Sequence, residues 1–442
     1  MSSPWSRTST WDDGGLTIGG LRAHELADRF GTPSYVLDVA DLRSRCREVR
    51  EAAERAGAEH GVPVAIYYAS KAFSATAVLR WAHAEGLRVD TASLGELVTA
   101  LRAGVPGEAI GLHGNNKSVE EIDTALAHGV GRLVIDSLPE IDLVAERARA
   151  AGVVAPVMVR VTTGVHAGGH EHIATAHEDQ KFGLSLATGA AREAIDRILA
   201  TPELHLLGLH SHIGSQILAT DGFVTAARAL LRLRAQVAAE GGVLLGELDL
   251  GGGFGVAYTP DDDAPPVPDV VAALVGEVAA AARELGTPIP ALSFEPGRAL
   301  VGPAVTTLYR VGTVKPVRLD DGGERVYVSV DGGMSDNIRT ILYDAVYTAA
   351  IASRTSDAPP RLSRVVGKHC ESGDIVVRDV MLPGDIGAGD LLAVPVTGAY
   401  GRSLASSYNQ LPRPGVVAVG DGEPREIVRR ETIDDLLALD LG

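Results

Sequence analysis

Two charged side chains stand directly behind short apolar runs of the sequence. Lys71 follows the run VAIYYAS, and Glu295 follows the run ALSF. Burying an unpaired charge is costly, so each group must find a partner, lose its charge or reach solvent. Lys71 is a candidate Schiff-base amine, although a lysine that ends a strand can also point into water. Glu295 needs a cation, which the neighbouring Arg298 or a protonated ring nitrogen could supply.

Other apolar runs end in an acid, in histidines or in glycines. Asp90 could orient the lysine, but capping of the helix that begins near Ser93 is slightly favoured. His210 and His212 could stack on a planar ring or pack in the core, and the core is the commoner place for a single histidine. The run GGGFG at 251–255 could surround an anion with backbone N–H groups or form only a tight turn. It matches neither the GxGxxG pattern nor a Walker loop.

Together these groups point to one cofactor. A lysine amine, a ring-stacking histidine, a glycine-lined anion pocket and a carboxylate are what pyridoxal phosphate requires. The amine bonds to the aldehyde, the pocket holds the phosphate and the acid keeps the ring nitrogen protonated. Other phosphate-binding barrels have no use for Lys71 and Glu295 together. We therefore expect pyridoxal 5′-phosphate as the cofactor.

No metal site is expected. Four histidines lie close together, but their spacing matches no standard zinc site: His166, His170, His172 and His177. The segment HCESGD around Cys370 also lacks metal-ligand spacing, and Cys46 is remote in sequence. Two cysteines cannot form a disulfide framework and fit a reducing compartment.

The elements that must position these groups alternate between residues 62 and 296. Apolar runs of strand length are followed by Ala-rich stretches of helix length, which indicates a parallel sheet. Eight such runs within ~250 residues predict a closed (β/α)₈ barrel, with an open doubly wound sheet as the alternative. The expected strands are 62–70, 87–93, 110–114, 132–137, 156–161, 206–212, 245–251 and 291–297, and the expected helices are 74–85, 95–103, 118–128, 139–151, 188–200, 221–240 and 267–286.

A length of 442 residues favours two domains. After Gly302 the sequence becomes β-rich and glycine-punctuated, which predicts a mostly antiparallel domain. The expected fold class is α/β plus all-β: an N-terminal segment that joins the β domain (1–37), the barrel (38–300) and the C-terminal β domain (301–442).

Composition excludes several classes of protein. Apolar residues form 45% of the chain, so global disorder is excluded. A net charge of −17 argues against binding to nucleic acid or to an anionic membrane surface. We see no secretory signal and no apolar run long enough to span a membrane, so we expect a cytoplasmic protein.

The sequence resembles the diaminopimelate decarboxylases, a family of fold-type III pyridoxal-phosphate enzymes related to ornithine and arginine decarboxylases. The resemblance covers nearly the whole chain and rests on the motifs YYASKAF, VDTASLGEL, HGNNKS, HEDQKFGLSL, HSHIGSQI, LDLGGGFGVAY, EPGRALVG, SDNIRTILYDA, HCESGD and GAYGRSLASSYN. It implies an alanine racemase-like barrel plus a β domain. It also implies a carboxy-lyase that converts meso-2,6-diaminopimelate to L-lysine and CO₂, the last step of lysine biosynthesis.

Position by position, the resemblance implies roles for named residues. Lys71 would form the internal aldimine and Cys370 would donate the proton. The cofactor would be held by Asp90, His212, Ser215, Gly253, Glu295, Gly297, Arg298 and Tyr400. The substrate would be bound by Arg298, Arg339, Tyr343, Glu371 and Tyr400. The histidine-rich segment 166–177 resembles the family's mobile active-site loop.

The resemblance further implies a homodimer with shared active sites, in which Cys370 and Glu371 reach the partner's cofactor and Lys181 pairs with Asp374 across the interface. Two arginines beside one glutamate suit a substrate whose far end carries both a carboxylate and an ammonium group. An ornithine, arginine or lysine decarboxylase is the alternative, because such an enzyme needs only an anion for a distal cation. A racemase is disfavoured by the Cys-Glu pair, and an inactive regulatory homologue by the presence of both Lys71 and Cys370.

Overall fold

The computed structural model describes residues 3–165 and 180–442. The chain divides into two compact units, and each is described by itself. One unit comprises Arg45–Gly255 and Pro265–Ala299, and the other comprises Met1–Ser44, Val256–Ala264 and Leu300–Gly442.

Within the described residues of the first unit, eight parallel strands form a closed barrel. They are β5 (Val64–Ala69), β6 (Arg88–Thr91), β7 (Ile110–Leu112), β8 (Arg132–Ile135), β9 (Ala155–Thr162), β11 (Leu204–His210), β12 (Glu247–Asp249) and β13 (Ala291–Phe294). The ring closes where β13 pairs with β5, with Leu292 opposite Val64. The short β10 (Leu184–Ser185) adds to β9. The predicted barrel is confirmed, and the open sheet is excluded.

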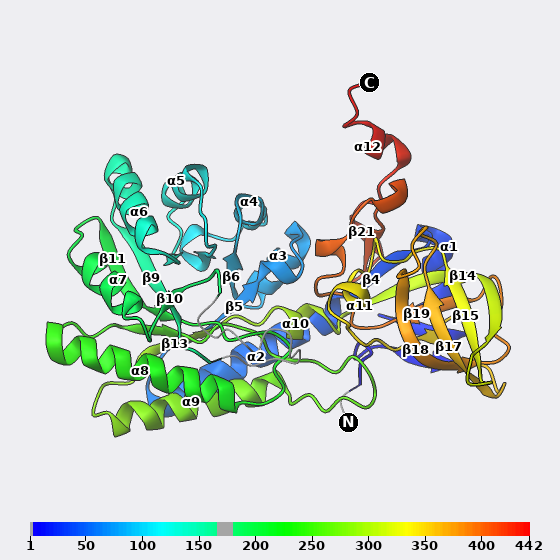
Figure 1. Ribbon diagram of the computed structural model, residues 1–442, viewed down its shortest axis with the longest axis horizontal. Helices are drawn as coiled ribbons and strands as arrows, with labels where there is room; N and C mark the ends of the chain where they lie inside the picture. Colours follow the sequence, from blue (N-terminus) through cyan, green and yellow to red (C-terminus); the bar gives the residue numbers. More distant parts are fainter. Residues whose placement is uncertain (1–2, 166–179) are drawn as a thin grey trace. The chain divides into compact units, whose positions relative to one another are not determined.

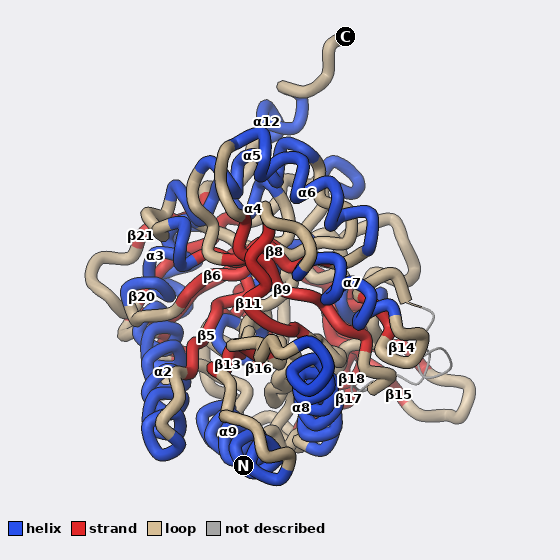
Figure 2. The backbone as a smooth tube through the Cα atoms, turned by 90° about the vertical axis from the view of Figure 1, so that its left-hand side faces the viewer, coloured by secondary structure: helices blue, strands red, loops and turns tan. Residues whose placement is uncertain are grey.

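Helices cover the outside of this barrel (Figure 2). They follow the strands in order: α3 (Thr76–Ala84), α4 (Leu94–Arg102), α5 (Val119–Ala127), α6 (Leu138–Ala151), α7 (Ala190–Leu199), α8 (Asp221–Gly241) and α9 (Val267–Glu284). Each buries an apolar face, as Leu230 and Leu231 of α8 and Val271 and Val275 of α9 show by their complete burial. The longer α2 (Val39–His60) precedes β5, and the short α10 (Arg298–Val301) follows β13.

The second unit is built on a sheet with the strand order β18-β17-β15-β14-β4-β20-β21, with β16 and β19 beside it (Figure 1). Its strands are β4 (Ser34–Asp38), β14 (Val305–Arg318), β15 (Glu324–Val330), β16 (Ala350–Ile351), β17 (Pro360–Val366), β18 (Ile375–Pro383), β19 (Leu391–Val394), β20 (Gly415–Val419) and β21 (Arg425–Val428). The predicted antiparallel character holds for most pairings. However, β15 pairs in parallel with β17, and β4 pairs in parallel with β20.

The N-terminal segment packs into the core of this unit. It contributes a small sheet of β1 (Thr10–Asp12), β2 (Gly15–Ile18) and β3 (Leu21–Arg22), followed by α1 (Ala23–Phe30). Leu16, Leu26 and Val36 form one apolar cluster with Leu308 and Val417. The short helices α11 (Arg339–Leu342) and α12 (Ile433–Leu437) complete the described elements. In the parts of the chain that the structure describes, we find no helix with the length and hydropathy of a membrane span.

Candidate active site

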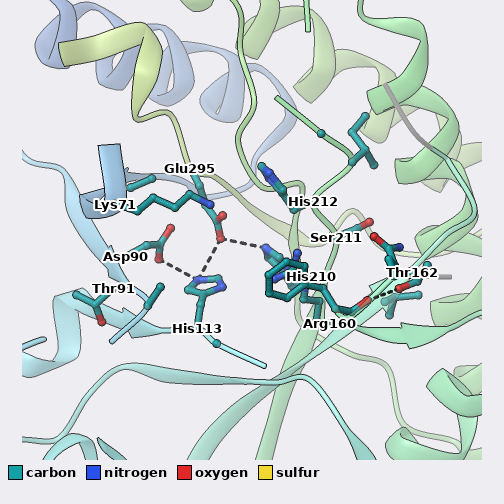
Figure 3. Close-up of a pocket in the computed structure, with 18 of the residues that line it drawn as sticks. Lys71, Asp90, Thr91, His113, Arg160, Thr162, His210, Ser211, His212 and Glu295 are labelled. Atoms are coloured by element: carbon teal, nitrogen blue, oxygen red, sulfur yellow. Dashed lines mark hydrogen bonds and ion pairs between the residues drawn. The ribbon is translucent and has the colours of Figure 1, made fainter. Parts of the chain in front are cut away.

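A cavity of about 290 Å³ opens at the carboxyl ends of the barrel strands. It collects four residues that the sequence analysis selected: Lys71 behind β5, Asp90 in β6, His212 behind β11 and Glu295 behind β13. Lys71 is exposed, and its side chain extends into this cavity toward Glu295 (Figure 3). The fold therefore brings an amine and an acid that are far apart in sequence onto neighbouring strands.

Asp90 and Glu295 are buried carboxylates on one wall of the cavity. Burial raises the pKa of Asp90 to about 7. Burial and, second, the charge of Asp90 also raise the pKa of Glu295. Both Asp90 oxygens and Glu295 Oε1 lack a hydrogen-bond partner among the described residues. These orphaned atoms mark a place where the site is built to receive a cationic or hydrogen-donating group.

Arg132 is a buried cation near Asp90 and Glu295, but its charge is already paired with another acid. Arg132 Nη2 lies 2.9 Å from Asp249 Oδ2, and Ser293 Oγ donates to the same oxygen at 2.6 Å. Among the described residues, only histidine nitrogens lie within ion-pair distance of Asp90 and Glu295. They belong to His113 and His210. A protonated ring nitrogen would supply the missing charge, so the donor set fits the pyridine ring of pyridoxal.

His212 is held at the cavity by the glycine run. The backbone N–H of Gly252 donates to His212 Nδ1 at 3.2 Å. Burial, and next the charge of Lys71, hold the pKa of His212 well below its usual value. The imidazole is therefore neutral, with its proton on Nε2, and offers an uncharged ring face to a planar ligand. This arrangement supports the stacking role over the core role, because His212 lines the cavity.

The residues predicted to hold the anion lie on the loops that follow β11, β12 and β13. Arg298 Nη2 donates to Ser215 Oγ at 2.8 Å. Gly253 O accepts from the backbone of Ile217 at 2.9 Å, which ties the two loops together. Gly253 has a φ of +103°, and a Cβ there would lie 2.3 Å from Gly214 O. Gly297 also packs closely on the turn before Lys71, where a Cβ would lie 3.0 Å from Ala69 O.

We expect Gly253→Ala to weaken cofactor binding about tenfold or more, because the added methyl group forces the two loops apart at a cost of about 1–3 kcal/mol. Gly104→Ala is the matched control, since Gly104 has a similar φ of +86° with no atom within 4 Å of its Cβ position. Equilibrium dialysis of both variants with pyridoxal phosphate gives the comparison. Equal affinities for the two variants would contradict this role for Gly253.

Six other predicted residues lie in the sheet unit. Cys370 and Glu371 are exposed on the loop between β17 and β18, and the backbone N–H of Cys370 donates to Asn409 Oδ1 at 3.1 Å. Asp374 is 3% exposed, and its carboxylate accepts from the backbone N–H groups of Met334 at 2.6 Å and His369 at 2.8 Å. In this chain Asp374 thus fixes the loop that carries Cys370.

The remaining three lie apart from that loop in sequence. Arg339 is buried, and its Nη1 donates to the hydroxyl groups of Tyr258 and Tyr347, each at 2.7 Å. Tyr343 is 48% exposed. Tyr400 has a φ of +61°, a strained conformation for a tyrosine that is commonly retained at functional sites. The roles of these residues, and the contact of Lys181 with a partner's Asp374, stay predictions.

Sequence reasoning missed two residues that line the cavity, His113 and Arg160, and left His210 open between ring stacking and a place in the core. His113 follows β7 just as Asp90 closes β6, so its position behind an apolar run was the available signal. The preference for Asp90 as a helix cap was wrong. Ser93 caps α4 by accepting from the N–H of Glu96, while Asp90 turns into the cavity.

The histidine cluster considered for zinc lies outside the described residues. Among the described residues, His113, His210 and Glu295 are close enough to hold a metal ion, with ligand atoms within 4.8 Å of one another. They belong to the cavity wall already described.

Comparison with known proteins gives independent evidence about the cofactor. The pyridoxal-binding domain of pyridoxal-dependent decarboxylases matches residues 40–302. The diaminopimelate decarboxylase of Mycobacterium tuberculosis is 51% identical, covering 99% of this chain and 97% of its own. That of Mycobacterium leprae is also 51% identical, covering 100% of this chain and 93% of its own. The chain belongs to the diaminopimelate decarboxylase family.

A solved structure shows the same family likeness in three dimensions. Diaminopimelate decarboxylase from M. jannaschii, in complex with L-lysine, superposes with a TM-score of 0.91 at 31% identity and covers 99% of this chain and 98% of its own. As a member of the diaminopimelate decarboxylase family the chain is a lyase that uses pyridoxal phosphate. The predicted cofactor and the recognised family are thereby confirmed.

Proposed function

We propose that this protein decarboxylates meso-2,6-diaminopimelate to L-lysine and CO₂. One observation carries the proposal from geometry: Lys71 and the orphaned acids Asp90 and Glu295 face a single cavity. The identity of the relatives adds the substrate, since their names specify diaminopimelate and the M. jannaschii enzyme was solved with L-lysine. This reaction would be the last step of lysine biosynthesis.

The cofactor would be held mainly by groups at the carboxyl ends of five barrel strands: β5, β6, β11, β12 and β13. Lys71 Nζ would bond to the aldehyde carbon, and His212 would lie against the ring. Glu295, with Asp90 beside it, would accept a hydrogen bond from the ring nitrogen. Ser215, Gly253, Gly297 and Arg298 would surround the phosphate, with Tyr400 as a further contact. When bound, pyridoxal phosphate supplies an electron sink for the charge that remains on the α-carbon after CO₂ leaves.

The chain's own residues then handle the proton and the far end of the substrate. The Cys370 thiol would give its proton to the α-carbon, since it is exposed on a loop fixed by Asp374. Arg298, Arg339 and Tyr343 would bind the distal carboxylate, and Glu371 would bind the distal ammonium group. Arginine suits this task because its planar fork can hold a carboxylate through two hydrogen bonds.

We further propose a homodimer in which Cys370 and Glu371 complete the site of the partner subunit, with Lys181 and Asp374 at the contact. Support for this part comes from the resemblance of the motifs. We propose a cytoplasmic location because both cysteines are thiols, as expected in a reducing compartment.

A substrate panel tests the activity. The purified protein, loaded with pyridoxal phosphate, is expected to release CO₂ from meso-diaminopimelate and far more slowly from L-ornithine, L-arginine or L-lysine. The expected selectivity is about 10²-fold or more, because those substrates leave a buried arginine without its carboxylate partner. Release from L-ornithine or L-arginine, with none from meso-diaminopimelate, would replace the proposal with the alternative decarboxylase.

A further inference from the structure

The proposed mechanism leaves unused a buried histidine that lies between the two acids of the cavity. His113 Nε2 is 3.3 Å from Asp90 Oδ1 and 3.3 Å from Glu295 Oε1 (Figure 3). Neither contact has the geometry of a full hydrogen bond, as is expected for one N–H shared between two acceptors. One imidazole thus touches both carboxylates.

The backbone and the neighbouring loop hold His113 in this place. Its backbone N–H donates to Thr91 O at 2.8 Å. Lys117 Nζ donates to Gly114 O at 2.8 Å and to Glu140 Oε1 at 2.7 Å, which fixes the turn that follows. The ring of His210 packs edge-on against His113, with centroids 5.0 Å apart. A side chain mounted in this way keeps its position when a ligand enters.

The charged and titratable groups around His113 come from every neighbouring strand: Asp90, Arg132, Arg160, His210, Asp249 and Glu295. Arg132 and Asp249 pair with each other. Arg160 lies 3.8 Å from Asp136 and over the ring of Phe182. Asp90 and Glu295 are therefore the acids that His113 contacts. His210 Nε2 lies 3.1 Å from the same Glu295 oxygen.

We propose that His113 is a positioning residue that joins Asp90 and Glu295 into one anionic pair facing the ring nitrogen of the cofactor. The proposal rests on the proposed function only in that the cavity holds pyridoxal phosphate. The imidazole shares its N–H between the two carboxylates and so opposes the rise in the pKa of Glu295 that burial and the charge of Asp90 cause. Burial lowers the pKa of His113 to about 4, so the imidazole is neutral and leaves the ring nitrogen as the cation of the pair.

The test compares three substitutions of His113 in the holoenzyme. His113→Leu removes the N–H. His113→Gln restores a donor near the position of Nε2, and His113→Asn is too short to reach it. His128→Leu is the matched control, since His128 is exposed at the end of α5. Each protein is loaded with pyridoxal phosphate labelled with ¹⁵N in the ring, and the ¹⁵N chemical shift is followed against pH.

We expect the ring nitrogen to lose its proton at a pH about 1–3 units lower in His113→Leu and His113→Asn than in the wild type, because the paired carboxylates then share a proton and lose charge. His113→Gln and His128→Leu should follow the wild-type curve. The dissociation constant of the cofactor should rise about tenfold in His113→Leu and His113→Asn.

Two results overturn the proposal. One is a wild-type titration curve in both His113→Leu and His113→Asn. The other is a downward shift of the ring-nitrogen titration in His113→Gln that is as large as the shift in His113→Leu. If His113→Leu fails to fold, as judged by circular dichroism, the titration curves of His113→Gln and His113→Asn still test the proposal. The measurement needs no substrate, so a failure of the wild type to decarboxylate meso-diaminopimelate overturns the proposed function and leaves this result readable.

Discussion

Lys71→Ala is expected to reduce decarboxylation by about 10³-fold or more, because the variant loses both the covalent hold on the cofactor and a positioned acid-base group. Lys71 is suited to this role by its place in the cavity, where it extends toward Glu295 (Figure 3). The measurement is CO₂ release from meso-diaminopimelate. Borohydride reduction followed by mass spectrometry should locate a pyridoxyl group on Lys71 of the wild type and none on the variant.

Lys315→Ala is the matched control for this substitution. Lys315 is an exposed lysine of β14, so its loss should change neither activity nor labelling. A pyridoxyl group on another lysine of the wild-type protein, with Lys71 unmodified, would remove Lys71 from the proposed role. It would also remove the reason for expecting an inactive variant.

Cys370→Ala is expected to slow decarboxylation by about 10²–10⁴-fold while cofactor affinity changes little, because alanine cannot donate a proton. The exposed thiol lies on a loop of the sheet unit, whereas the predicted cofactor ligands, apart from Tyr400, lie in the barrel unit. The measurement is therefore a comparison of turnover with the dissociation constant of pyridoxal phosphate. A fall in turnover matched by an equal fall in cofactor affinity would indicate a structural role for Cys370 in place of proton donation.

Cys46→Ala is the control, since Cys46 is completely buried in α2 and should leave turnover near that of the wild type. The same variants test the shared site. Mixing Lys71→Ala and Cys370→Ala subunits should restore activity, because one of the two sites in a mixed dimer then has both groups. No recovery after proven subunit exchange would place both groups in a single chain.

The barrel was predictable because the same pattern of an apolar run and an amphipathic stretch recurs along the sequence. Eight apolar runs, the first seven each followed by an amphipathic stretch, match β5 to β9 and β11 to β13 to within a few residues. The parallel pairing of β15 with β17 in the other unit was not predictable in this way. Strands there are joined by irregular segments such as the one from Asp331 to Ala349, and a sequence does not reveal which edge such a segment returns to.

The site residues likewise include some that were predictable from the sequence and some that were not. Lys71 and Glu295 were found because a charge directly behind an apolar run is chemically conspicuous. Asp90 was placed among the cofactor ligands only by family resemblance, because on residues alone a helix cap was slightly favoured. His113 was signalled only by its place behind an apolar run, and Arg160, which lies inside such a run, was not signalled at all. Their importance depends on which side chains face the barrel interior, and that is fixed by strand register, which spacing alone does not give.

The pairing of β4 with β14 and β20 has a consequence for how the protein is made. Strand β4 is synthesised before the barrel, yet the strands beside it begin at Val305 and Gly415. Synthesis at about 5–20 residues per second leaves β4 without neighbours for tens of seconds. Both its edges are then open to strands of other nascent chains. The period before β14 emerges is thus the one in which this polypeptide is most exposed to aggregation, and in which a chaperone would help it most.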